Sequence, residues 1–317
     1  MDRDRLPPRL LIAGALLLVL AGAADTGPLP ISEARWLPEE RRLEGLSTQP
    51  PECLRMPPNE PDRQAVAIGR AALRAPLLLG GQAARAGLSC ASCHKNGRGN
   101  PDFSFPGLSG KPGTADVTSS IMSSHRGDGT QNPKPIPDLA DPPRLAAHDR
   151  ESRALERFLR GLIVEEFDGR EPTPAVLNGL AEYVRAVDPE ACRGKKAERV
   201  TLEAMLSDGR AAVAAAIIAL GARDRPTALF LVGAARSRLG AVDERYRLPG
   251  LEPSRALLRR SDLKLRAIEA AIRNGAPEAL RQMQDWQRRW PDLKRGLKRQ
   301  EELSFFSRRV LRRYLAS

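Results

Sequence analysis

Five consecutive residues, from Cys90 to His94, read Cys-Ala-Ser-Cys-His and constrain this chain more than any other feature. Two cysteines three positions apart lie about one helical turn from each other, so both thiols can face the same ligand. Each can form a thioether with a haem vinyl group, and the adjacent imidazole can bind the haem iron. We therefore expect a covalent haem c, with iron, held by Cys90, Cys93 and His94.

Two other kinds of site use paired cysteines. A thiol–disulfide redox site is expected beside a βαβ pattern, which is missing here, and has no need of His94. A zinc site would require two further ligands at short spacing, and the neighbouring sequence offers none. A chance match of two Cys and one His in this register arises on the order of once in a thousand chains. Haem attachment is the interpretation that uses all three residues.

The N-terminus has the pattern of a secretory signal peptide over residues 1–24. Three arginines precede an apolar run from Leu10 to Leu20, and small residues follow at 21–24. The run is shorter than the roughly 20 residues that span a bilayer, so we expect cleavage and no membrane-spanning segment elsewhere. Because thioether-bound haem is made outside the cytoplasm, a periplasmic location is predicted.

The two remaining cysteines lie at the edges of the predicted haem domain. Cys53 precedes it and Cys192 closes it. In an oxidising compartment the pair can form a disulfide that closes a long loop in the unfolded chain, and the alternative is two unpaired thiols. We predict the disulfide.

Residues 25–192 divide into two parts. Residues 25–61 contain eight prolines, each of which fixes φ and removes a backbone donor, so an extended Pro-rich linker is expected. The haem domain follows at 62–192, with a first helix capped by Asp62 and later helices near 155–163 and 176–187. Between them lies a long Gly- and Pro-rich loop, which is unusual unless it wraps a cofactor. Aromatic residues are few, so the macrocycle itself should supply much of the core.

The sixth iron ligand decides the chemistry of such a site. Met122 and His125 lie in the Gly-rich loop and are the distal candidates, whereas Met56 lies before the domain and His148 at the start of a helix. A Met ligand raises the reduction potential and a His ligand lowers it, while an open position admits small ligands such as peroxide or carbon monoxide. The alternatives are a buried loop anchor for Met122 and a solvated residue for His125.

Positive charge is concentrated in the last part of the chain. Residues 193–317 hold 28 Lys and Arg against 14 Asp and Glu, whereas the remainder holds 23 against 25. Apolar stripes at helical spacing predict a basic helical bundle domain here, with helices near 197–220, 226–246, 254–274, 277–290 and 292–315. Trp286 and Trp290 are expected in its core, with a contact surface as the alternative. A basic surface suits an acidic protein partner or anionic lipid, and nucleic acid is not expected outside the cytoplasm.

A family resemblance rests on the residues around the haem motif. The stretch from Ala67-Ile68-Gly69-Arg70 through Leu77-Leu78-Leu79-Gly80 to Ser89–His94 resembles the start of a haem domain in the bacterial di-haem cytochrome c peroxidase superfamily. The later segments 113–118 and 126–129 are similar to the substrate-side loop of that family. The resemblance covers about residues 62–190 and implies an all-helical, loop-wrapped mono-haem cytochrome c fold.

The departure from that family narrows the expected function. Its peroxidases carry two haem motifs, whereas this chain has one, so a two-haem mechanism is unsupported. We expect an all-α protein, with a cytochrome c-like domain and a helical bundle. Its expected function is that of an exported electron carrier that docks a redox partner through the bundle. The alternative is a peroxidase-like haem enzyme or a gas or redox sensor with an open distal site.

Overall fold

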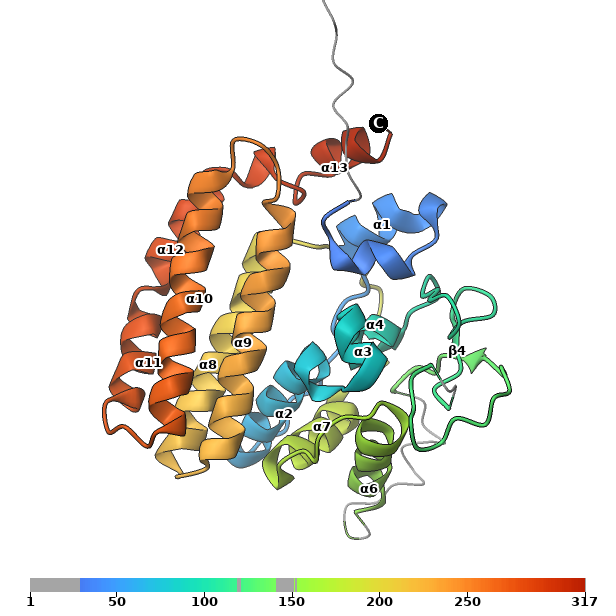
Figure 1. Ribbon diagram of the computed structural model, residues 1–317, viewed down its shortest axis with the longest axis horizontal. Coiled ribbons are helices and arrows are strands. Elements are labelled where there is room, and N and C mark those ends of the chain that lie inside the picture. Colours follow the sequence, from blue (N-terminus) through green and yellow to red (C-terminus); the bar gives the residue numbers. More distant parts are fainter. Residues whose placement is uncertain (1–28, 119–120, 141–150, 152, 317) are drawn as a thin grey trace, which may run out of the picture.

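The computed structural model describes residues 29–118, 121–140, 151 and 153–316. Helices dominate this part of the chain (Figure 1). Its strands are two residues long and pair into three antiparallel two-stranded ribbons. The all-α prediction is confirmed at this level. The predicted signal peptide, residues 1–24, and His148 lie outside the described residues.

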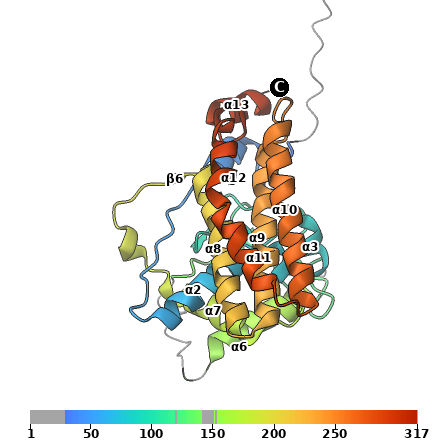
Figure 2. The same cartoon turned by 90° about the vertical axis from the view of Figure 1, so that its left-hand side faces the viewer.

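Long helices of the C-terminal half run side by side (Figures 1 and 2). Helices α8 and α9 pack along each other, α10 lies against α9, and α11 and α12 complete the layer against α8 and α10. Their first turns are capped where the sequence offers a cap: the Thr201 and Asp224 side chains accept from backbone N–H groups of α8 and α9. The elements are α8 (Leu202–Gly221), α9 (Arg225–Arg245), α10 (Glu252–Arg273), α11 (Ala279–Arg288), α12 (Trp290–Lys298), η6 (Glu301–Leu303) and α13 (Arg308–Leu315).

One predicted helix is wrong: residues 292–315 form α12, η6 and α13 rather than a single helix. The break is held by Arg245 of α9, whose carbonyl accepts from Phe305 N at 2.9 Å and whose Nη1 donates to Phe305 O at 3.2 Å. Phe305 is buried, so the chain leaves its helical path to place this ring in the core. Tertiary contacts override the local helical periodicity here.

Helix α8 is a long apolar helix at the centre of the bundle. By length and composition alone, Leu202–Gly221 is long and apolar enough to cross a membrane, although no span was expected beyond the N-terminal run. It packs against α2, α9 and α11, and it carries nine buried residues. Its apolar character thus serves, in this structure, the packing of a central bundle helix.

The part of the chain before α8, which contains Cys90–His94, is called the haem-motif half. It is built on two crossing helices, α2 (Glu60–Leu73) and α7 (Pro174–Ala186). They approach so closely that a Cβ on Gly69 would lie 1.9 Å from the carbonyl oxygen of Gly179. Helix α2 begins two residues before the predicted cap: Asn59, not Asp62, is the N-cap, and its side chain accepts from Asp62 N at 2.9 Å. The predicted helices near 155–163 and 176–187 are confirmed.

Short elements connect these two helices, and one more, η5, follows α7. The helical ones are η3 (Pro76–Leu78), α3 (Gly81–Ala86), α4 (Cys90–Cys93), α6 (Ala154–Gly161), the π-helical turn η4 (Leu162–Glu166) and η5 (Pro189–Cys192). Two ribbons pair β2 (His94–Lys95) with β3 (Arg98–Gly99) and β4 (Thr114–Ala115) with β5 (Lys134–Pro135). The described residues between β3 and α6 are otherwise loop, as the Gly and Pro content predicts.

The segment expected to be an extended linker contains regular structure. It forms η1 (Ser32–Trp36), η2 (Glu39–Arg41), α1 (Arg42–Ser47) and β1 (Thr48–Gln49), and β1 pairs with β6 (Glu198–Arg199). Helix α1 packs against α13 near the C-terminus (Figure 1). The prolines flank these elements, and between them apolar side chains such as Leu46 are fully buried. The extended-linker expectation is therefore wrong for residues 32–49.

The two halves share one hydrophobic core. A single cluster of buried side chains includes Val66 of α2, Leu180 of α7, Leu202 of α8 and Leu265 of α10. Helix α2 packs directly on α8 and α9. Trp286 and Trp290 belong to the same cluster, with ring centroids 5.3 Å apart, so the predicted core role is confirmed.

Candidate haem-attachment site

Helix α4 is a single turn that carries both motif cysteines. Its start is fastened by the Ser89 N–H, which donates to Ser92 Oγ at 3.1 Å. Its end is fastened by Asn100, whose N–H donates to Cys93 O and whose side-chain amide donates to Ser92 O, both at 2.9 Å. Cys90 and Cys93 are free thiols in this structure, so the spacing of three residues is held by backbone hydrogen bonding and not by a disulfide.

His94 follows α4 and is oriented by a backbone carbonyl. Its Nδ1 lies 3.1 Å from Pro137 O. Because a carbonyl oxygen can only accept, this contact places the proton on Nδ1 and leaves the lone pair on Nε2. Metal-binding histidines in proteins usually have their second ring nitrogen held in this way. The sequence pointed to His94 but gave no sign of Pro137, 43 residues further along the chain.

An apolar cluster packs against the two thiols. Its buried members are Trp36, Leu79, Ala83, Leu88, Phe103, Leu108 and Met122, and Cys90 and Cys93 pack against it. Burial raises the pKa of Cys90 to about 11 and that of Cys93 further still. Thiols with raised pKa values are poor nucleophiles, which argues against a thiol–disulfide exchange site and agrees with a site that receives a large apolar group.

The two distal candidates lie in different surroundings. Met122 is 1% exposed and belongs to the apolar cluster that holds both thiols. The His125 side chain is 58% exposed, and its Nδ1 lies 3.0 Å from Asp168 Oδ1. Although its partial burial favours the neutral acid, hydrogen bonds from Ser124 and His125 hold the pKa of Asp168 below its usual range. The structure thus places Met122, and not His125, in the apolar cluster against which both cysteines pack.

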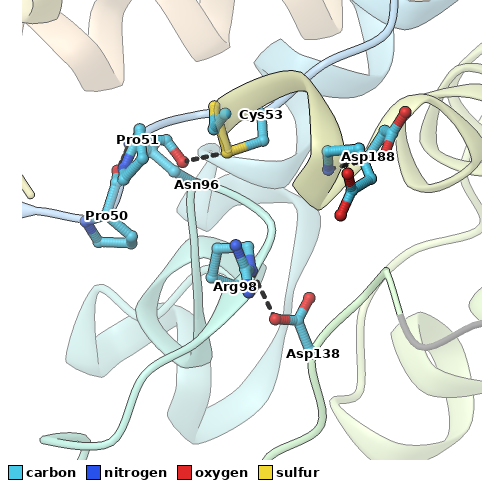
Figure 3. The surroundings of a disulfide bond; sticks show 9 residues. Pro50, Pro51, Cys53, Asn96, Arg98, Asp138 and Asp188 are labelled. Carbon is cyan, nitrogen blue, oxygen red and sulfur yellow. Dashed lines mark hydrogen bonds and ion pairs between the residues drawn. A yellow bond between two sulfur atoms is a disulfide. The ribbon is translucent and has the colours of Figure 1, made fainter. Parts of the chain in front are cut away.

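Cys53 and Cys192 form the predicted disulfide, with Cα atoms 5.3 Å apart. It joins the segment before α2 to η5, after α7, and backbone hydrogen bonds continue the junction: Asp188 N donates to Cys53 O at 2.8 Å. Figure 3 shows that the segment before Cys53 also reaches the loop after His94, where Asn96 Nδ2 donates to Pro50 O at 2.8 Å. The disulfide therefore braces the backbone beside the haem motif.

A buried charged network, which the sequence did not reveal, lies behind this loop. Glu52 accepts from Arg70 Nε at 2.7 Å, from Arg74 Nη2 at 2.8 Å and from the Tyr183 hydroxyl at 2.9 Å. Burial alone would raise the pKa of Glu52, but the two guanidinium groups lower it below its ordinary value. The available signal was the spacing of Arg70 and Arg74, four apart on the α2 face that also carries apolar residues.

The network forms part of the wall of a cavity of about 480 Å³. Ser89, Ala91 and Ser92 on the outer side of α4 line one part of it, and Asp208 and Arg238 of the bundle line another. The turn that carries the haem motif therefore faces the bundle across this cavity, which has both charged and apolar walls. Among the described residues, no group of three or more His, Cys, Asp and Glu gathers in a way that could hold a metal ion.

The residues of this site fit a covalent haem by the chemistry of their donor set. Two neighbouring thiols pack against an apolar cluster, an imidazole has its Nδ1 proton committed to a carbonyl, and the thioether sulfur of Met122 belongs to that cluster. No protein-family model, curated protein or solved structure matches the chain, so these residues carry the functional argument alone.

Proposed function

We propose that this protein is an exported c-type cytochrome that binds one haem covalently and transfers electrons. Cys90 and Cys93 would form the thioethers, and His94 Nε2 would be the proximal iron ligand. The observation that carries the proposal is the hydrogen bond between His94 Nδ1 and Pro137 O, because it presets the imidazole for coordination beside two partly buried thiols. When bound, the haem supplies one-electron iron chemistry.

Met122 is the proposed sixth ligand. Its burial in the cluster that holds both thiols supports this assignment, whereas the exposure of His125 and its contact with Asp168 argue against the histidine. A Met and His pair gives a low-spin iron with a raised potential, as suits electron transfer. The surrounding Leu and Phe side chains would exclude water from the iron, which lowers the cost of reorganisation during electron exchange.

The basic bundle is the proposed docking surface for an acidic redox partner. Exposed cations gather on the outer face of α10, at Arg259, Arg260, Lys264 and Arg266. Long-range attraction of this kind accelerates encounter and is screened as salt rises. Because the bundle shares its core with α2 and α7, deleting residues 193–317 would expose that core, so docking has to be tested by surface substitution.

A periplasmic location belongs to the same proposal. The Cys53–Cys192 disulfide supports an oxidising compartment, and the arginine-led apolar run at the N-terminus supports export.

Haem content tests the central proposal. The full chain, exported in a host with cytochrome c maturation machinery, should give one c-type haem per chain in a pyridine haemochrome assay. The haem should resist extraction into acidified acetone, and Cys90→Ala/Cys93→Ala should lose it. Haem that the acidified solvent extracts from the unaltered protein would refute covalent attachment.

Carbon monoxide separates the two functional classes. A Met122-ligated electron carrier should keep its reduced spectrum under carbon monoxide. A rapid spectral change in the unaltered protein would instead favour a peroxidase-like enzyme or a gas sensor with an open distal position.

A further inference from the structure

Asp208 is a buried carboxylate within the apolar helix α8 of the bundle. Three guanidinium groups approach it: Arg70 Nη1 at 2.6 Å, Arg238 Nη2 at 3.1 Å and Arg74 Nε at 3.4 Å. Arg70 belongs to α2 and Arg74 is the C-cap of that helix, so both lie in the haem-motif half. A buried charge is tolerated only when it is paired, so the positions of Asp208 and its three arginines depend on one another.

Arg74 connects the ion pairs of Asp208 to the loop that follows His94. Its side chain is 8% exposed, and besides Asp208 it contacts Glu52 and the side-chain oxygen of Asn96, each at 2.8 Å from Nη2. Nη1 also donates to the carbonyl of Arg70 at 3.2 Å. With both arms of the guanidinium engaged, the position of Asn96 depends on where Arg74 is held.

Asn96 is two residues beyond His94 and adopts a left-handed backbone conformation with φ of 54°. Its side chain is held at both ends, by Arg74 on the oxygen and by Pro50 O on the amide nitrogen. The turn it forms is closed by Gly97 N donating to His94 O at 3.0 Å. Non-glycine residues in this conformation persist where the surroundings enforce it, and such strain is common at functional sites.

We propose that Asp208 is a positioning residue for the haem: through Arg74 and Asn96 it fixes the turn after His94, and thereby the orientation of the axial imidazole. This inference rests on the proposed function. It assigns the fused bundle a role in setting the properties of the iron, in addition to partner docking.

The charge of Asp208 adds a second effect with a defined sign. Burial alone would raise the pKa of Asp208, but Arg74, Arg238 and Arg70 hold it below its ordinary value, so the side chain is anionic at neutral pH. Removing this negative charge leaves the network more positive, which favours the ferrous form of the iron and raises the reduction potential.

The experiment compares four variants of the full-length, haem-loaded protein, of which Asp208→Glu retains the charge. Asp208→Asn removes the charge and loosens Arg74. Asn96→Gly keeps the left-handed backbone, removes the bridge to Arg74 and leaves every charge in place. Asp262→Asn is the matched control, because it removes a carboxylate that pairs with Arg236 at 2.8 Å between α9 and α10.

Reduction potential and the ferric electron paramagnetic resonance spectrum are the readouts, measured after haem content is verified. We expect Asp208→Asn to shift the ferric–ferrous equilibrium about threefold or more toward the ferrous form, where tenfold corresponds to 59 mV for one electron. Asp208→Asn and Asn96→Gly should both change the spectral anisotropy that reports axial-ligand orientation. Asp262→Asn should change neither, and Asp208→Glu should restore the unaltered behaviour in large part.

The outcomes separate the two proposals. Absence of covalent haem in the unaltered protein refutes the proposed function. With haem present, unchanged spectra in Asn96→Gly and Asp208→Asn overturn the positioning role, as does an equal shift in Asp262→Asn. If Asp208→Asn fails to fold, Asn96→Gly alone decides, because it buries no unpaired charge.

Discussion

Removing the disulfide between Cys53 and Cys192 should cost this protein a large part of its stability. The two residues are 139 positions apart in the sequence, so the bond closes most of the haem-motif half into one loop. In the chain-entropy model a loop of this length restricts the unfolded state by about 17 cal/mol/K, or about 5 kcal/mol at 25 °C. Natural domains have a total unfolding free energy of roughly 5–15 kcal/mol.

The measurement is urea unfolding of the haem-loaded Cys53→Ala/Cys192→Ala protein beside the unaltered protein. We expect a lower midpoint and, because the unfolded chain is no longer cross-linked, a steeper dependence on urea. Covalent haem content should be unchanged, since the haem cysteines are untouched, and this serves as the control for correct maturation. A loss of less than about 1 kcal/mol would contradict the argument and show that the loop is already restricted without the bond.

Four further outcomes are expected. Gly69→Ala should destabilise the protein by about 3 kcal/mol or more in urea unfolding, because its Cβ would lie 1.9 Å from Gly179 O, whereas Gly240→Ala, with open space around its Cβ, should not. Met122→Ala should gain carbon monoxide binding in the reduced state while His125→Ala should not, and the reverse result would reassign the distal ligand. Above pH 4.5 the unaltered protein should have a higher melting temperature than Glu52→Gln, and this difference should shrink as the pH falls through the lowered pKa of Glu52. A difference in melting temperature that does not change with pH would disprove ionic pairing. Replacing Arg259, Arg260 and Lys264 with Glu should slow reduction by the natural partner at low salt but not at high salt, and equal rates at low salt would remove α10 as a docking face.

Local sequence rules predicted most of the helices because each depends on near neighbours. The apolar stripe of α10 and the threonine that caps α8 lie within a few residues of the turns they define. Similar reasoning failed at residues 292–315, where the helix is interrupted so that Phe305 can enter the core beside Arg245. It also failed for residues 32–49, where proline content suggested an extended chain but buried side chains stabilise short helices.

The candidate site shows the same division. Cys90, Cys93 and His94 lie within five residues, so the sequence alone predicts a haem-attachment site there. The different surroundings of Met122 and His125 were not predictable in this way, because the two are three residues apart in one loop and only the folded chain buries the first and exposes the second.

The sequence by itself determined the groups on which the proposed covalent chemistry depends: a thiol pair at one-turn spacing, an adjacent imidazole and two cysteines flanking one region. These features depend on bonds and short spacings that the chain carries in any conformation. Only the tertiary structure decided that Pro137 orients His94, that Glu52 and Asp208 pair with the arginines of α2, and that the bundle shares a core with the haem-motif half. Those contacts join residues dozens to more than a hundred positions apart, and their strength comes from burial, which exists only once the chain has folded.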